Sequence, residues 1–187
     1  MTIWQLTTGL SDQVATLVIP EADQSLGAMK RFGGDDSTLA WRKPPRLEAN
    51  NDGRKKPKPV GELGPFLPGA LVLGEKAHAA LEPFLSRLGQ LLKLDVDGVP
   101  HWFYNVTHPV SCIDRERSEQ RAGGTIGKEA FIDAAVPASA AVFKDPATAR
   151  ARIHVNEPRR QVLEDAAARA GVQGLEFLPT GLAKESA

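Results

Sequence analysis

The sequence predicts an α+β protein in which two main helices pack on a mostly antiparallel sheet, and three observations lead to this fold class. Apolar residues recur at spacings of three and four from about Glu75 to Gln90, the pattern of an amphipathic helix. A second helix is expected to begin after Asn156, a favourable N-cap, and to end before Gly171. Short β-rich runs separated by turn residues lie between these helices, as in antiparallel sheets.

Length and composition restrict the class of protein. The chain has 187 residues, of which 42% are hydrophobic and 25% charged, as expected for one globular domain that folds without disulfides. The 23 basic and 23 acidic residues cancel, which argues against a surface devoted to nucleic acid. One cysteine, no signal-peptide pattern and no long apolar run predict a cytoplasmic protein without a membrane segment.

The first 65 residues are predicted to lie outside the main core. Residues 1–42 are expected to form a β-rich arm, with strands at Gln13–Pro20 and Thr38–Lys43. Residues 43–65 contain five prolines and three glycines with little to bury, so we expect a flexible, basic, Pro-rich surface loop. The cationic cluster Arg54–Lys58 is typical of a solvated loop, and the alternative is contact with an anionic partner.

A β-hairpin is expected to follow the first helix, in which Pro83 predicts a kink. The dipeptide Asp97-Gly98 separates two β-rich runs, Leu91–Val96 and His101–Val106, and is the typical sequence of a two-residue hairpin turn. Alternation places aromatic residues on both faces of the second run. We therefore expect this strand to be covered on both sides or to lie at an interface.

Further short strands are predicted along the rest of the chain, at Pro109–Ile113, Ala130–Ile132, Ala140–Phe143, Arg152–Val155 and Gly174–Pro179. The charged segment Asp114–Glu119 is expected to be a loop between the first two of them.

The segment Leu94–Ser118 gathers residue types that active sites use, including two of the four histidines and the single cysteine. Strand spacing separates them, because His108 lies four residues from Cys112, or roughly 13 Å along a strand. Asp114 shares a face with Cys112, and a carboxylate raises the pKa of a thiol. Metal-ligand spacings are missing, and the sequence Gly123–Lys128 is an incomplete phosphate loop. We therefore predict no catalytic, cofactor-binding or metal-binding residues.

The order of motifs from about Phe66 to Pro179 resembles immunity protein family eleven of bacterial polymorphic toxin systems. The matching features are a helix with a leucine-x-proline segment, a hairpin that ends in asparagine-valine, and two later groups of residues. These groups are Cys112, Asp114 and Ser118, and then Gly174, Leu175, Phe177 and Pro179. The resemblance makes residues 66–182 the immunity-like α+β core, whereas the first 65 residues match more weakly.

The resemblance implies a function that composition does not indicate. Members of the family are encoded beside a toxin and protect the producing cell by binding the toxin domain, which blocks the toxin active site or holds the toxin inactive. They are not thought to be enzymes. Because this sequence shows no signal-peptide pattern, the toxin that it counters is expected to act in the cytosol. Two alternatives remain open: a small hydrolase that uses Cys112 or a histidine, and a nucleic-acid-associated regulator that acts through Arg54–Lys58.

A toxin interface is expected to use aromatic and charged anchors, because binding energy concentrates in Trp, Tyr and Arg. The carboxylates among the candidates would suit a basic toxin groove of the kind that holds nucleic acid. The predicted partner-binding residues are Trp41, Arg42, Trp102, Tyr104, Asp114, Arg115, Glu116, Arg117 and Glu119.

Overall fold

The structure is a computed structural model, and it describes residues 2–10, 12–21, 38–50, 53 and 56–181. Its strands are β1 (Ile3–Thr8), β2 (Thr16–Val18), β3 (Arg46–Asn50), β4 (Leu63–Gly64), β5 (Leu71–Leu73), β6 (Gly89–Val96), β7 (Val99–Val106), β8 (Ile113–Gln120), β9 (Ile126–Phe131), β10 (Val142–Phe143), β11 (Ile153–Asn156) and β12 (Leu175–Pro179). Its helices are α2 (Glu75–Leu85), the short 3-10 helix η2 (Asp133–Ala135) and α3 (Glu157–Ala170).

The strands form three sheets, and the predicted α+β class with two helices on a mostly antiparallel sheet system is confirmed. One sheet has the order β10-β11-β1-β12 and a second has the order β2-β3-β6-β7-β5-β4. The third is the hairpin of β8 and β9. Of the strand pairs in these sheets, β3 with β6 is parallel and the others are antiparallel.

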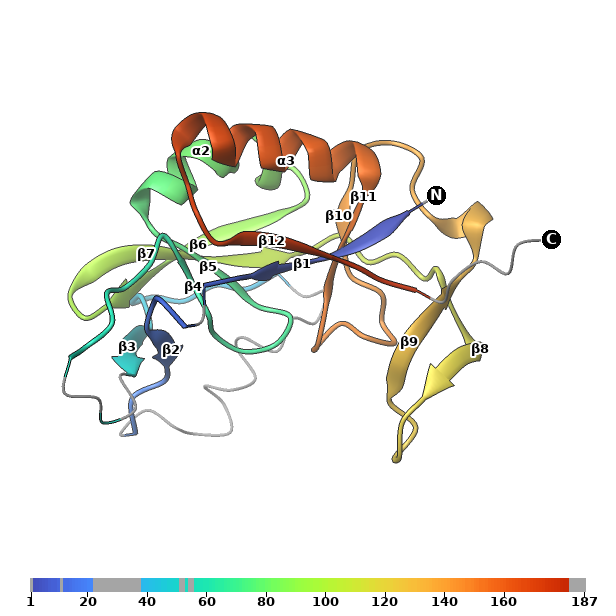
Figure 1. The fold of residues 1–187 in the computed structure, drawn as a ribbon, viewed down its shortest axis with the longest axis horizontal. Coiled ribbons are helices and arrows are strands. Elements are labelled where there is room, and N and C mark those ends of the chain that lie inside the picture. The colour runs from blue at the N-terminus through green and yellow to red at the C-terminus, as the bar shows by residue number, and fades with distance from the viewer. Residues whose placement is uncertain (1, 11, 22–37, 51–52, 54–55, 182–187) are drawn as a thin grey trace.

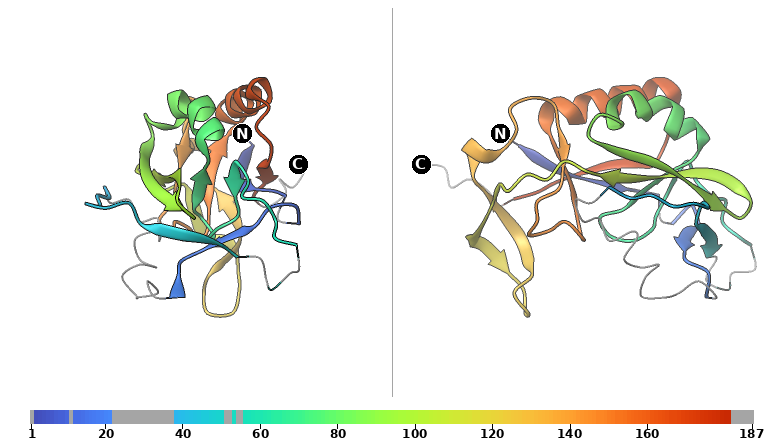
Figure 2. Two further views of the ribbon diagram at one scale, coloured as in Figure 1. Left: turned by 90° about the vertical axis from the view of Figure 1, so that its left-hand side faces the viewer. Right: turned by 180° about the vertical axis from the view of Figure 1, so that it is seen from behind.

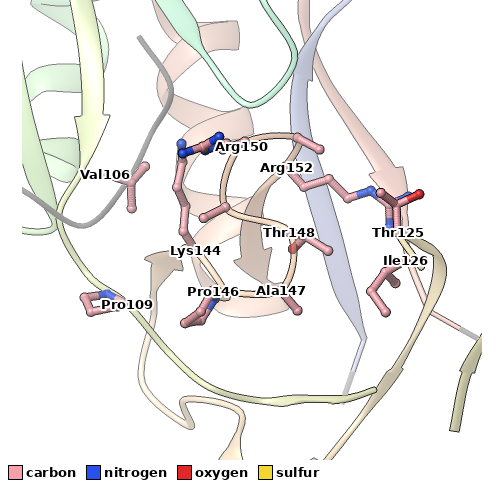
Figure 3. Close-up of a pocket in the computed structure, with 12 residues that line it drawn as sticks. Val106, Pro109, Thr125, Ile126, Lys144, Pro146, Ala147, Thr148, Arg150 and Arg152 are labelled. Atoms are coloured by element: carbon pink, nitrogen blue, oxygen red, sulfur yellow. The ribbon is translucent and has the colours of Figure 1, made fainter. Parts of the chain in front are cut away.

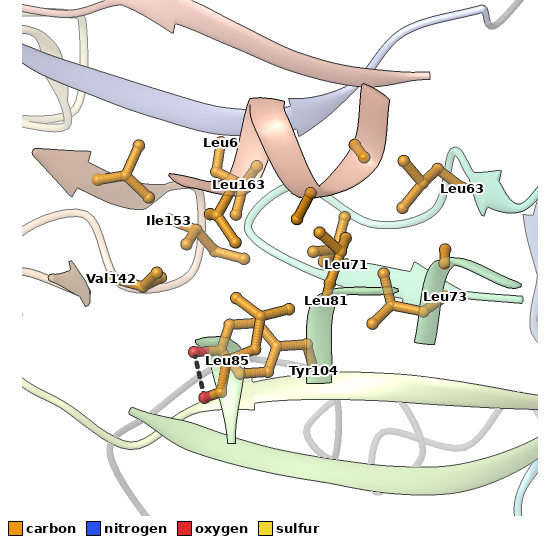
Figure 4. Close-up of a cluster of buried hydrophobic side chains, with 14 of the residues drawn as sticks. Leu6, Leu63, Leu71, Leu73, Leu81, Leu85, Tyr104, Val142, Ile153 and Leu163 are labelled. Carbon is orange, nitrogen blue, oxygen red and sulfur yellow. Dashed lines mark hydrogen bonds between the residues drawn. The ribbon is translucent and has the colours of Figure 1, made fainter. Parts of the chain in front are cut away.

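Helices α2 and α3 lie together on one side of the strands (Figure 1). They bury leucine and alanine side chains in the largest apolar cluster, which also receives residues from β1, β5, β7 and β11 (Figure 4). Helix α3 has the predicted ends, since Asn156 accepts from Arg159 N–H at the N-cap and Gly171 adopts φ 62° after the last turn. No helix in the described part of the chain is long and apolar enough to cross a membrane.

Helix α2 ends at Leu85, so it is shorter than the predicted helix Glu75–Gln90. The helical spacing continues in the sequence, but the residues after Leu88 pair with β7 as strand β6. Gly89 permits this pairing, since a Cβ atom there would lie 2.4 Å from the carbonyl oxygen of Asn105. Pro83 lies in the last turn of the shortened helix.

Two predictions about the first 65 residues are wrong for the part that the structure describes. Strand β1 is no peripheral arm, since it pairs with both β11 and β12 inside the four-stranded sheet. Strand β3 runs through the predicted loop and buries Leu47 completely, because it pairs with β2 and β6. Residues 38–43 form no strand. Arg54 and Lys55 of the cationic cluster lie outside the described residues.

The central hairpin of β6 and β7 is confirmed. Asp97 and Gly98 have φ values of 50° and 85°, the left-handed conformations that a two-residue hairpin turn requires. Strand β7 is covered on both faces, with Phe103 and Tyr104 each 1% exposed on opposite sides. The structure thus has the first of the two arrangements that the alternation in the sequence left open.

Candidate functional site

The β8–β9 hairpin extends away from the sheets that carry the helices (Figures 1 and 2). Its first strand, β8, is the segment predicted to be a charged loop. The strand predicted at Pro109–Ile113 is therefore wrong in position, since the observed strand begins at Ile113. Strand pairing overrides the weak strand propensity of a charged run here, because Asp114 pairs with Ala130 and Glu119 with Lys128.

The hairpin exposes charges along consecutive residues of β8. The register shifts between Asp114 and Glu119, and the Asp114 carboxylate accepts from the N–H groups of Glu116 and Arg117 at 3.1 Å. This irregularity breaks the usual alternation, so Arg115, Glu116 and Arg117 are all exposed. None of these three side chains has a hydrogen-bond or ion-pair partner among the described residues.

A buried carboxylate anchors the start of the hairpin. Asp145 is 3% exposed, and its Oδ2 accepts from the N–H groups of Cys112 and Ile113 at 2.7 and 2.8 Å. Its Oδ1 accepts from the N–H of Ala147 at 2.8 Å. One side chain therefore ties β8 to the segment that leads into β11.

A buried ion pair anchors the second strand. Glu129 in β9 has a side chain 2% exposed and pairs with Arg152, whose side chain is 16% exposed. Arg152 also donates through Nη2 to the carbonyl of Gly127 at 2.8 Å. Burial, and the nearby Arg121, lower the pKa of Arg152 from its ordinary value.

Sequence reasoning did not identify these anchors. Glu129, Asp145 and Arg152 lie on separate segments, and no spacing in the sequence relates them. His154 is completely buried between Phe131 and Phe143, and burial lowers its pKa to about 4. The one local signal that could have indicated a buried Glu129 is its position next to the apolar residues Ala130 and Phe131 in a predicted strand.

The aromatic candidates lie apart from the hairpin. Trp41 packs against the cluster around Phe103 and donates to the carbonyl of Lys93 at 2.7 Å. Trp102 lies on the opposite face of β7 and stacks on His78 with ring centroids 4.1 Å apart. Both tryptophans are partly exposed, and Arg42, next to Trp41, is exposed. The structure therefore brings Asp114, Arg115, Glu116, Arg117 and Glu119 together and leaves the aromatic candidates elsewhere.

Tyr104 is a core residue, which corrects its assignment as a surface anchor. Its side chain is 1% exposed in the main apolar cluster, and its hydroxyl donates to the carbonyl of Leu85 at 3.2 Å (Figure 4). Alternation alone could not separate a buried tyrosine from an interface tyrosine, because both lie on an apolar face.

Tyr104→Phe is expected to lower the free energy of unfolding by about 1 kcal/mol, since it removes one buried hydrogen bond and keeps the ring. Urea unfolding followed by circular dichroism measures the change. The partly exposed Trp102→Phe serves as the comparison, because it alters the same strand without removing a buried hydroxyl. A Tyr104→Phe variant as stable as the wild type would contradict the importance of this bond.

Cys112 does not have the environment of a nucleophile. It is completely buried, and burial together with the nearby Asp145 raises the pKa of its thiol to about 12. A nucleophilic cysteine reacts as the thiolate, whereas this group is a neutral thiol near pH 7. Within the described residues, no three His, Cys, Asp or Glu side chains come together as metal ligands.

A cavity of about 420 Å³ lies beside the hairpin (Figure 3). One wall is the turn from Pro146 to Arg152, and Val106 and Pro109 lie on the facing segment. Lys144 before that turn, and Thr125 and Ile126 where β9 begins, complete the lining.

The sequence was compared with known protein families and with curated proteins. No model of a known protein family matches the sequence, and a search of curated proteins finds no significant match. The resemblance to immunity protein family eleven therefore depends on the ordered motifs between Phe66 and Pro179 alone.

Proposed function

We propose that this protein is an immunity protein that binds a cognate toxin domain and neutralises it in the cytosol of the producing cell. The observation that carries the proposal is the β8–β9 hairpin, which exposes Arg115, Glu116 and Arg117 while buried side chains anchor both of its strands. The ordered motif resemblance supplies the class of partner.

Anchoring of the hairpin favours recognition of a protein. Association costs less when the contact surface is already ordered, because little conformational entropy is lost on binding. Asp145 and the Glu129–Arg152 pair provide this order without using any of the exposed charges. The hairpin can therefore present a fixed pattern of charge to a partner.

The charge pattern favours selectivity for one partner. Arginine and glutamate alternate from Arg115 to Arg117, and Glu119 follows after Ser118. Charges of both signs at an interface penalise partners whose pattern does not match. The outer edges of β8 and β9 also pair with no other strand in the described part of the chain. An added strand from the toxin could extend the hairpin by main-chain hydrogen bonds.

Co-expression tests the proposal. The gene that neighbours this one is expected to encode a large protein with a toxic C-terminal domain, and this domain is the probe. The wild-type protein is expected to restore growth of cells that express the domain, and the purified pair is expected to form a stable complex by calorimetry. Continued killing together with no complex would overturn the proposed function.

Charge reversal tests the position of the interface. Arg115→Glu with Arg117→Glu is expected to weaken toxin binding by about a hundredfold, since each reversal opposes a matched charge. Arg169→Glu on the exposed surface of α3 is the matched control and should leave the affinity unchanged. Full affinity in the double variant would place the interface elsewhere and leave toxin binding itself intact.

Reversal of the acidic positions indicates the type of toxin groove. Glu116→Lys with Glu119→Lys should be the more damaging pair if the toxin presents a basic groove that normally holds nucleic acid. The arginine pair should be the more damaging if the toxin surface is acidic.

A further inference from the structure

The cavity beside the hairpin has the composition of a small-molecule site. Its volume of about 420 Å³ lies in the range that enclosed organic ligands occupy. Apolar groups dominate its lining, including Val106, Pro109, Ile126 and Pro146. Pockets of this kind bind the apolar body of a ligand and use a few polar groups to orient it.

The charged residues of the lining are all basic, namely Lys144, Arg150 and Arg152. Arg152 is neutralised by Glu129, which lies outside the cavity lining. Arg150 is exposed, and its guanidinium has no hydrogen-bond or ion-pair partner among the described residues. The cavity lining therefore retains, at Arg150, a positive charge that no acidic side chain in the described part of the chain pairs with.

We propose that this cavity binds a small amphiphilic anion, in which a carboxylate or phosphate is attached to an apolar body. The apolar body lies against Val106, Pro109 and Ile126, and the anionic group meets Arg150 and Lys144. Arginine suits both anions, since its planar guanidinium donates two parallel hydrogen bonds to either. The inference is independent of toxin binding, because it uses none of the exposed β8 charges.

The walls of the cavity are preformed. The turn from Asp145 to Arg152 is closed by backbone bonds, with the carbonyl of Thr148 accepting from the N–H groups of Ala151 and Arg152 at 2.8 and 3.0 Å. Thr148 Oγ1 is also held by His154 Nε2 at 3.0 Å. A ligand that enters this site does not have to order the turn, which lowers the cost of binding.

Lys144 is positioned at the cavity by a neighbouring loop. Its Nζ donates to the carbonyl of Gly69 at 2.8 Å, and this bond holds the ammonium charge at the cavity lining. Gly69 adopts φ +70°, and a Cβ atom there would lie 3.0 Å from the backbone of Ala151. The glycine thus permits the close approach that brings Lys144 and the turn together.

A series of probes with the same apolar body tests the charge preference. Hexanoate, hexyl phosphate, 1-hexanol and hexylammonium are titrated into the isotopically labelled full chain, and amide shifts are followed by NMR. The two anions are expected to shift the amides of Thr125, Ile126 and residues 144–152 in a saturable manner. Hexanol should bind more weakly, and hexylammonium should not bind at the cavity.

Two variants test the assignment of the site. Arg150→Ala should weaken hexanoate binding by about tenfold, which corresponds to one charge-assisted hydrogen bond. Ala147→Leu should weaken all the probes, since it fills part of the cavity. Arg169→Ala is the charge-matched control and should bind hexanoate as the wild type does.

Three results would overturn the inference. They are no saturable shifts with either anion, equal affinity for hexanoate and hexanol, and unchanged hexanoate affinity in Arg150→Ala. Arg150 is exposed on a surface turn, so its variant is expected to fold, and the dispersion of its amide spectrum verifies this.

Discussion

Asp145→Ala is expected to lower the free energy of unfolding by about 4 kcal/mol, one of the two largest effects that the structure predicts. The change removes the acceptor of three backbone N–H groups. Those of Cys112 and Ile113 are buried, and an unsatisfied buried donor costs about 1–3 kcal/mol. Denaturant unfolding measures the total loss.

Hydrogen exchange locates the effect of Asp145→Ala. The amides of Cys112 and Ile113 and of the β8–β9 hairpin should exchange faster in the variant, while those of α3 keep most of their protection. Asp145→Asn should lose less stability, since one amide oxygen can still accept from two donors. Asp165→Ala, an exposed carboxylate of α3, is the control and should change stability by less than about 0.5 kcal/mol. A loss of less than about 0.5 kcal/mol for Asp145→Ala as well would contradict the anchoring role of Asp145.

Glu129→Ala is expected to cost about 3–5 kcal/mol of folding stability, because it leaves the largely buried charge of Arg152 without its partner. The double variant Glu129→Gln with Arg152→Met should recover much of the loss, since the two buried charges then disappear together. Thermal and denaturant unfolding of Glu129→Gln, Arg152→Met and the double variant give the coupling energy between the two side chains.

The exposed pair of Lys128 and Glu119 in the same hairpin is the matched control. Its nitrogen and oxygen are 3.9 Å apart, and both side chains are more than half exposed. Lys128→Ala should therefore cost less than about 1 kcal/mol. Equal losses for Lys128→Ala and Glu129→Ala would show that burial of the ion pair has no special importance.

Both large effects also bear on the proposed function. If the hairpin binds the toxin, loosening its base should weaken binding even where the exposed charges are unchanged, because the partner must then order the hairpin. Asp145→Asn is the useful variant for this purpose, since it should remain folded. Toxin binding that is insensitive to this variant would favour another surface.

Several elements followed from local patterns in the sequence. The caps of α3 depend on Asn156 and Gly171, and the β6–β7 turn depends on the left-handed conformations of Asp97 and Gly98. Each pattern acts within a few residues, so it can be recognised without knowledge of the fold. Helix α2 was predicted too long because the same apolar spacing also fits the first residues of β6.

The candidate site was predictable in part. The charges of Asp114–Glu119 were recognised as a contact surface from composition, but their strand conformation depends on pairing with β9, several residues further along the chain. Trp102 and Tyr104 were indistinguishable as anchors, although the structure exposes one in part and buries the other. Burial depends on which elements cover a strand, and no local pattern encodes that.

The sequence by itself determined the α+β class, helix α3, the central hairpin and a chain of balanced charge. Only the tertiary structure decided that β1 pairs within the four-stranded sheet, that β3 is buried and that Asp145, Glu129 and Arg152 hold one projecting hairpin. The physical reason is the separation along the sequence over which each interaction acts. Helix caps and turns are stabilised by interactions between neighbouring residues, whereas strand order and buried ion pairs arise from groups that meet only when the chain has folded.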